Sequence, residues 1–204
     1  MNRRILTRSS ILATALALAS LMPCVTLASN IVYTGVPTSQ SNLGWSYSLN
    51  YGQSLAAEFS IGSSTTITSV EGYMNSLYGN PTATITISQD AGDIPGSTIF
   101  SGNFTGAPGE GWQGLSSLNW ILGAGTYWVT FNNPGGSGGM AGLAPFPLLN
   151  EAYTNSGNWY GQDSLYIGVW IQGESNSVAD SGATLALLVG TFIGLAAFRS
   201  RFVK

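Results

Sequence analysis

Several segments of the chain alternate between apolar and polar residues with a period of two, the pattern of a β-strand with one buried face. The segment from Leu55 to Ile61 places an apolar side chain at every second position, and the segment from Thr82 to Ser88 adds β-branched residues, which favour strand over helix. The same alternation recurs at residues 126–131 and 165–172. These four segments are therefore predicted to be core strands.

Turn-forming residues separate the predicted strands. They lie at residues 79–81, 90–96, 106–111, 123–125 and 132–139, and no amphipathic helix appears between them. Short strands that each bury one face need a second sheet to cover that face. The predicted domain is therefore all-β, an antiparallel β-sandwich of the jelly-roll type.

A basic and then apolar segment precedes this domain. Three arginines come before the apolar run at residues 11–22, and Thr26-Leu27-Ala28 supplies the small residues that a signal peptidase reads. Residues 1–28 are therefore predicted to form a signal peptide, helical in its apolar part and cleaved after Ala28.

A second apolar segment lies near the end of the chain. Residues 183–198 carry no charge and no polar stripe, and as a helix of about 24 Å they can just span a hydrocarbon core of about 30 Å. Basic residues beside both apolar segments predict that both ends stay in the cytoplasm while the middle crosses the membrane. A buried core helix is the alternative, although it would normally show one polar face. The flanking basic residues are Arg199, Arg201 and Lys204.

A short motif precedes this apolar segment and reads Val178, Ala179, Asp180, Ser181, Gly182. With the apolar helix and the basic end, it resembles the bacterial PEP-CTERM class of sorting signals. The nearest variant is VPDSG-CTERM, in which proline stands at the position of Ala179. The resemblance implies processing by an exosortase-type membrane enzyme and delivery to the cell surface or an exopolysaccharide matrix. The predicted organisation is a signal peptide at 1–28, a sandwich at 29–173, a linker with the sorting motif at 174–182, and a transmembrane helix with its basic tail at 183–204.

The order of segments within the domain carries a second resemblance. The strand pieces at 58–59, 67–73 and 83–88, the turn at 90–97, and the later pieces at 125–128 and 172–173 follow one another as in the β-sandwich modules called choice-of-anchor domains. The likeness spans roughly residues 31–173 and rests mainly on turns. It implies a fold and no particular activity.

Charge is distributed very unevenly along the chain. All six basic residues lie at the two ends, whereas residues 29–177 hold eight carboxylates and no Lys, Arg or His. Nucleic-acid binding, which needs cations to neutralise phosphates, is excluded on this basis. The chain has no His, and its one cysteine, Cys24, lies within the predicted signal peptide, so catalytic triads, thiolate nucleophiles and the usual zinc sites are excluded as well. We predict no enzyme and no cofactor.

Glycoside hydrolysis stays open as the least favoured alternative. It needs only two carboxylates about 5 to 10 Å apart across a cleft. The candidates are Glu58, Glu71, Glu110 and Glu151, and no spacing in the sequence pairs them.

Two aspartates in one turn are weak candidates for a metal site. Asp90 and Asp93, with the carbonyls of their glycine-containing turn, could bind Ca²⁺, which prefers oxygen ligands. Hairpin turn chemistry explains the same residues more simply. We predict the turn and no metal.

Several aromatic residues fall on the polar side of the predicted strands or in loops. Their flat faces could stack on sugar rings while neighbouring amides and carboxylates supply directional hydrogen bonds. The alternative is that loops or an edge strand cover the rings, which then form a second small core. The candidate glycan contacts are Trp128, Trp159, Tyr166 and Trp170.

The function predicted from these observations is that of an exported, non-catalytic surface or matrix protein with a structural or adhesive role. The alternative from the binding class is a carbohydrate-binding module of the exopolysaccharide matrix. The expected partners are an exosortase-like processing enzyme, the membrane through the C-terminal helix, and extracellular polysaccharide.

Overall fold

The structure, a computed structural model, describes residues 28–38, 46–49, 53–78, 82–134, 137–162 and 165–176. Within these segments, no helix is long and apolar enough to cross a membrane. The apolar part of the predicted signal peptide, the sorting motif and the predicted transmembrane helix lie outside the described residues.

Seven strands form the first sheet, in which β4 is the longest member. The order is β1, β13, β4, β10, β2, and two further strands, β7 and β8, also pair with β4. The bounds are β1 (Ser29–Tyr33), β2 (Ser46–Ser48), β4 (Thr65–Tyr78), β7 (Gly111–Leu115), β8 (Trp120–Leu122), β10 (Ser137–Ala141) and β13 (Val169–Ser175).

Six strands form the second sheet, in the order β12, β11, β3, β9, β5, β6. The bounds are β3 (Ser54–Ile61), β5 (Thr82–Asp90), β6 (Pro95–Thr105), β9 (Gly125–Asn132), β11 (Glu151–Asn155) and β12 (Asn158–Gly161). Every strand pair in both sheets is antiparallel. The prediction of an all-β, antiparallel domain is therefore confirmed.

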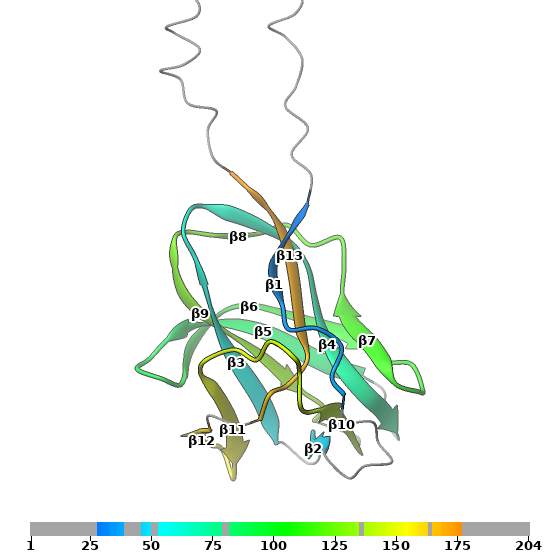
Figure 1. The fold of residues 1–204 in the computed structure, drawn as a ribbon. Helices are drawn as coiled ribbons and strands as arrows, with labels where there is room; N and C mark the ends of the chain where they lie inside the picture. The colour runs from blue at the N-terminus through cyan, green and yellow to red at the C-terminus, as the bar shows by residue number, and fades with distance from the viewer. Residues whose placement is uncertain are drawn as a thin grey trace, which may run out of the picture.

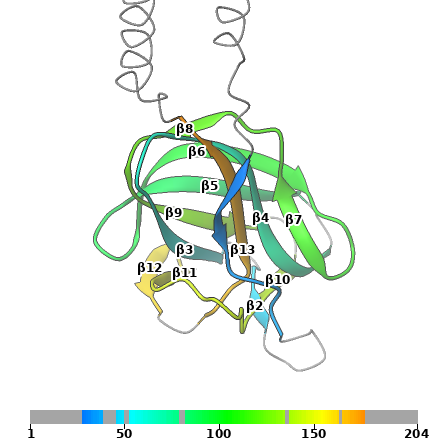
Figure 2. The ribbon, with the colours of Figure 1, turned by 45° about the horizontal axis from the view of Figure 1, so that its top comes forward.

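The two sheets pack face to face and share one apolar core. In Figure 2, β13, β4 and β7 lie in front of β9, β5 and β6. The core draws on both layers because each strand sends alternate residues inward, and the inward positions predicted for β3, β5 and β9 are confirmed. Members from the first sheet include Ile67, Val70, Val169 and Ile171, and members from the second include Leu55, Phe59, Ile85, Val129 and Phe131.

The strand predicted at residues 165–172 begins later than expected. Leu165 and Ile167 are buried as their alternation indicates, yet β13 starts only at Val169. Tyr166 has a left-handed backbone with φ of 51°, which is incompatible with a strand. The amides of Tyr166 and Ile167 donate hydrogen bonds to the Glu151 side chain instead of to a neighbouring strand. The Glu151 carboxylate thus takes the place of the strand-to-strand hydrogen bonds that the alternation of residues 165–168 predicts.

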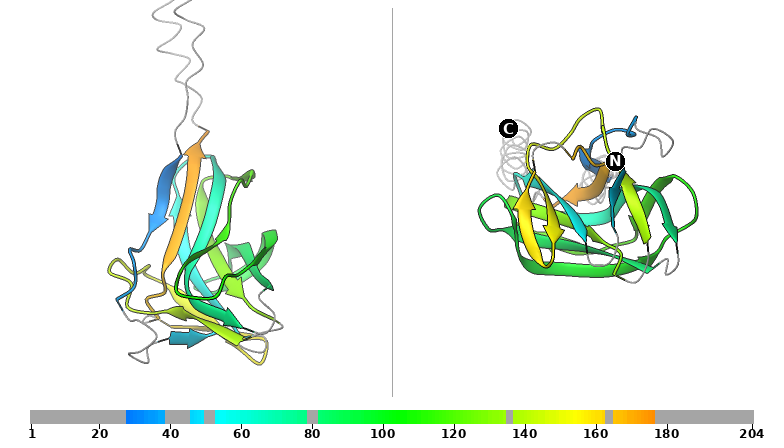
Figure 3. Two further views of the ribbon diagram at one scale, coloured as in Figure 1. Left: turned by 90° about the vertical axis from the view of Figure 1, so that its right-hand side faces the viewer. Right: turned by 90° about the horizontal axis from the view of Figure 1, so that it is seen from below.

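The first and last strands of the domain lie next to each other. Ser29 of β1 is the partner of Gly173 of β13, and Glu174 and Ser175 continue along β4. Consequently, the described chain enters and leaves the sandwich at the same end (Figure 1). Figure 3 shows the blue β1 and the orange β13 running side by side in one layer.

Candidate functional site

Four aromatic rings from four neighbouring strands gather on the outer side of the seven-stranded sheet. Val169 and Ile171 point into the core, so the residue between them, Trp170 of β13, points outward. Figure 2 shows the four strands side by side. We call this cluster the aromatic face: Tyr33 of β1, Tyr73 of β4, Trp112 of β7 and Trp170 of β13.

Trp112 contacts each of the other three rings of the aromatic face. Its ring centroid lies 5.3 Å from that of Tyr73, 5.7 Å from that of Trp170 and 5.8 Å from that of Tyr33. Tyr33 and Trp170 are also in contact, at 5.4 Å with an edge-on geometry. Because β7 pairs with β4, and β13 pairs with the other edge of β4, the Trp112 indole has to lean across β4 to reach Trp170. The rings thus form one continuous cluster.

Glycines bring the strands of the aromatic face close together. A Cβ atom on Gly114 would lie 2.1 Å from the Val70 carbonyl oxygen of β4, so β7 approaches β4 closely only because this residue has no side chain. A Cβ atom on Gly168 would lie 2.5 Å from the Cβ of Tyr73. The two glycines therefore allow the approach on which Trp112 and Tyr73 depend.

The aromatic face remains open to solvent and carries polar groups among its rings. Tyr33 is 43% exposed, and the other three rings are half-buried. The Trp170 indole Nε1 donates a hydrogen bond of 2.8 Å to Asn30 Oδ1, which fixes the ring. Trp170 also lies directly opposite Glu71 in the β13–β4 register. Half-exposed rings beside a carboxylate and an amide are the chemistry that binds sugars, because rings stack on C–H faces and polar groups accept from hydroxyls.

Trp128 does not belong to this face. Its ring is fully buried on the outer side of the six-stranded sheet, in a second small core with Ala56 and Ala152. Trp159 of β12 packs against this cluster. The covered-ring alternative therefore applies to Trp128, because β11 and β12 extend the sheet and fold a hairpin beside it.

Tyr166 also lies away from the aromatic face. It occupies the left-handed position before β13, and its amide bonds to Glu151 on the side of the six-stranded sheet. Of the four candidate glycan contacts, the structure thus places only Trp170 on the aromatic face.

The two aspartates of the predicted turn have separate surroundings. Asp90 accepts a hydrogen bond of 2.9 Å from the Trp128 indole Nε1, and Asp93 occupies a left-handed turn position with φ of 63°. The hydrogen bond gives Asp90 a structural partner. Among the described residues, no three acidic or other metal-ligating side chains cluster.

The four candidate glutamates are divided between the two sides of the sandwich. Glu71 lies on the outer side of the seven-stranded sheet, and the exposed Glu110 comes just before β7. Glu58 lies in β3 of the other sheet and accepts a hydrogen bond from the Asn150 amide. Glu151 is only 1% exposed, with both carboxylate oxygens accepting backbone amides. Thus Glu58 and Glu151 sit in one sheet, and Glu71 and Glu110 beside the other.

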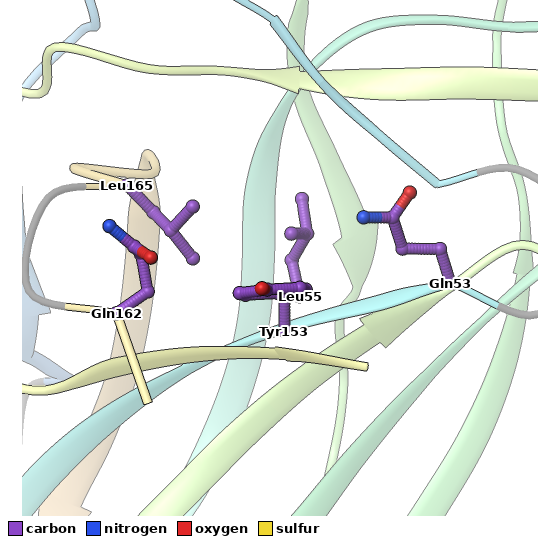
Figure 4. Close-up of a pocket in the computed structure, with 5 residues that line it drawn as sticks. All are labelled: Gln53, Leu55, Tyr153, Gln162 and Leu165. Atoms are coloured by element: carbon purple, nitrogen blue, oxygen red, sulfur yellow. The ribbon is translucent and has the colours of Figure 1, made fainter. Parts of the chain in front are cut away.

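A hollow of about 310 Å³ lies beside the edge of the six-stranded sheet. Leu55 and Tyr153 form its centre, with Gln53 on one side and Gln162 and Leu165 on the other (Figure 4). The Tyr153 ring stacks on Tyr160 outside the hollow at 5.6 Å. Tyr153 is the one aromatic residue among the five that line this hollow, against four in the aromatic face, and none of the five carries a carboxylate.

Sequence reasoning missed three members of the aromatic face. Tyr73 follows an alternation from Ser69, in which Val70 and Met74 point inward, so its outward direction was readable from the sequence. Tyr33 lies in a short strand interrupted by a bulge between Asn30 and Val32, which breaks the periodicity. Nothing in the sequence around Trp112 indicates that β7 pairs with β4.

The comparisons with known proteins add no further information about the site. The sequence matches no protein family model and no curated protein.

Proposed function

We propose that this protein is an exported, non-catalytic β-sandwich that binds polysaccharide through its aromatic face at the cell surface or in the extracellular matrix. The observation that carries the proposal is the cluster of four rings on one sheet, one exposed and three partly buried, joined by contacts of 5.3 to 5.8 Å. Four strands hold these rings, so binding needs little ordering of side chains, which lowers its entropic cost.

The sequence features at the two ends support the location in this proposal. The predicted signal peptide at 1–28 and the predicted sorting motif at 178–182, with its apolar and basic tail, support export followed by exosortase-type processing. The eight carboxylates and the absence of any Lys, Arg or His in residues 29–177 also suit an extracellular protein without a nucleic-acid partner. The proposed role is retention of the matrix through binding, with no chemical conversion of the glycan.

Removing the Trp112 ring tests the binding part of the proposal. In the full chain, Trp112→Ala is expected to weaken retention on exopolysaccharide extracted from the producing cells by about tenfold, since the variant loses the ring that touches all three others. Retention would be measured as the bound fraction across a polysaccharide titration, with melting temperature recorded to confirm folding.

Tyr160→Ala is the matched control for this experiment. Tyr160 is 46% exposed, comparable with Tyr33, but it lies in β12 of the opposite sheet and stacks on Tyr153, which lines the hollow. It should leave retention unchanged. Loss of retention in Tyr160→Ala together with full retention in Trp112→Ala would move the binding site to the hollow.

Truncation after Ser177 tests the sorting part of the proposal. The truncated protein lacks residues 178–204 and is expected to appear in the medium, whereas the wild type should remain with the envelope or matrix and lose its tail. Fractionation and mass spectrometry of the mature protein would show this. A wild-type protein that keeps its whole tail in the inner membrane would make residues 178–204 a plain anchor.

A further inference from the structure

The aromatic face contains a carboxylate that is partly removed from water. Glu71 of β4 lies between Trp170 on one neighbouring strand and Gly114 on the other. Within the described part of the chain, its carboxylate makes no hydrogen bond and no ion pair. Burial raises the pKa of Glu71 above its usual range, as expected for a carboxyl group that loses hydration without gaining a partner.

A second carboxylate, that of Glu110, influences Tyr73 on the same face. Burial, and in second place the negative charge of Glu110, raise the pKa of Tyr73. Glu110 belongs to a turn that Gln113 braces, because the Gln113 side chain hydrogen-bonds the Ala107 amide at 2.8 Å and the Ala107 and Gly109 carbonyls at 3.1 and 3.2 Å. The braced turn keeps this charge near the rings.

No cationic side chain of the domain can neutralise these carboxylates. There is no Lys, Arg or His between Arg8 and Arg199, so, apart from the terminal amine that the predicted cleavage leaves on Ser29, a positive charge at the aromatic face has to come from a ligand. Ammonium groups are attracted both by carboxylates and by the faces of tryptophan and tyrosine rings. Uronic acids and sulfated sugars would instead meet like charges, which disfavour binding.

We infer that the aromatic face selects a polysaccharide with free amine groups, in which sugar rings stack on Trp112 and Trp170 while an ammonium group pairs with Glu71. This inference rests on the proposed function and specifies its ligand by charge. The ammonium group would compensate Glu71 for the hydration that burial removes, because a nearby cation favours the ionised carboxylate. A neutral sugar offers only hydroxyl groups for the same position.

Three oligosaccharides of one length separate this inference from the proposed function. The full chain, purified in detergent, would be titrated with a glucosamine hexamer at a pH where its amines are protonated, with the N-acetylglucosamine hexamer, and with a galacturonate hexamer. We expect the glucosamine hexamer to bind about tenfold more tightly than its acetylated counterpart, and the galacturonate hexamer to bind most weakly. Equal affinity for the first two would overturn the inference alone, whereas no binding of any hexamer would count against the proposed function as well.

Glu71→Gln tests the residue assigned to the ammonium group. The substitution keeps the shape of the side chain and removes its charge, so affinity for the glucosamine hexamer should fall about tenfold while affinity for the acetylated hexamer stays the same. Glu58→Gln is the control because Glu58 lies in the opposite sheet, and it should change neither affinity. An equal loss in both variants would indicate attraction to an acidic domain as a whole and would overturn the assignment to Glu71.

Discussion

Trp128→Ala is expected to lower the free energy of unfolding by about 4 kcal/mol. The ring is fully buried against Ala56 and Ala152, two small residues that cannot move far enough to fill the space. The substitution also removes the indole donor from Asp90. Urea denaturation followed by circular dichroism would measure the loss.

Two variants separate the contributions to this effect. Trp128→Phe keeps most of the ring but not its N–H group, so it should cost clearly less than Trp128→Ala. Trp170→Ala removes a half-buried ring from the aromatic face and should cost about 1 kcal/mol. A Trp128→Ala protein as stable as Trp170→Ala would mean that Trp128 is not buried. Any loss of glycan retention in Trp128→Ala would reflect unfolding.

The stability of the protein should decrease as pH rises from about 4.5 to about 7, and Glu151 should account for about 3 kcal/mol of that decrease. Burial raises the pKa of Glu151 from its ordinary value of 4.5 to about 7, an effect that hydrogen bonds from the backbone amides of Tyr166, Ile167 and Leu165 partly offset. Between these values the folded protein holds a proton that the unfolded chain has lost. Folding is therefore favoured most below the lower value, and this contribution is lost above the higher one.

Glu151→Gln is the variant that isolates this contribution. A glutamine does not titrate, so the slope of unfolding free energy against pH between 4.5 and 7 should be flatter than in the wild type. The absolute stability should also fall, because one amide N–H of the 166–167 segment then faces the glutamine NH₂ group. Glu71 titrates in both proteins and cancels in the comparison. Identical slopes in the two proteins would contradict the assignment to Glu151.

Local periodicity predicted the strands of this domain well where one face is buried and the other is solvated. It placed β3, β5 and β9 because each alternates cleanly along its length. It placed Trp128 on the outer side of β9 but could not show whether water or other residues cover the ring, because both cases give the same alternation. It also extended β13 too far, because no local signal reveals that the Glu151 side chain captures residues 166 and 167.

The candidate site depended even more on contacts that the sequence does not encode locally. Trp170 was predicted to point outward because it lies in a well-patterned strand. Its neighbours on the aromatic face come from positions 33, 73 and 112, and only the pairing of β1 with β13, and of β13 and β7 with β4, brings them together. The choice of Gly114 matters just as much, yet a glycine in a Gly-rich chain gives no indication that it lies against a neighbouring backbone.

The position of β13 has a mechanical consequence. This strand pairs along one edge with β1 and along the other with β4, and a tether attached beyond residue 176 would pull along its axis. Backbone hydrogen bonds in antiparallel sheets run perpendicular to the strands, so such a force shears many of them together instead of opening them one by one. Trp170 is part of the same strand. With the C-terminal attachment to the cell that is proposed above, a polysaccharide bound at Trp170 would be connected to the cell through a single strand that is paired on both edges and resists extraction.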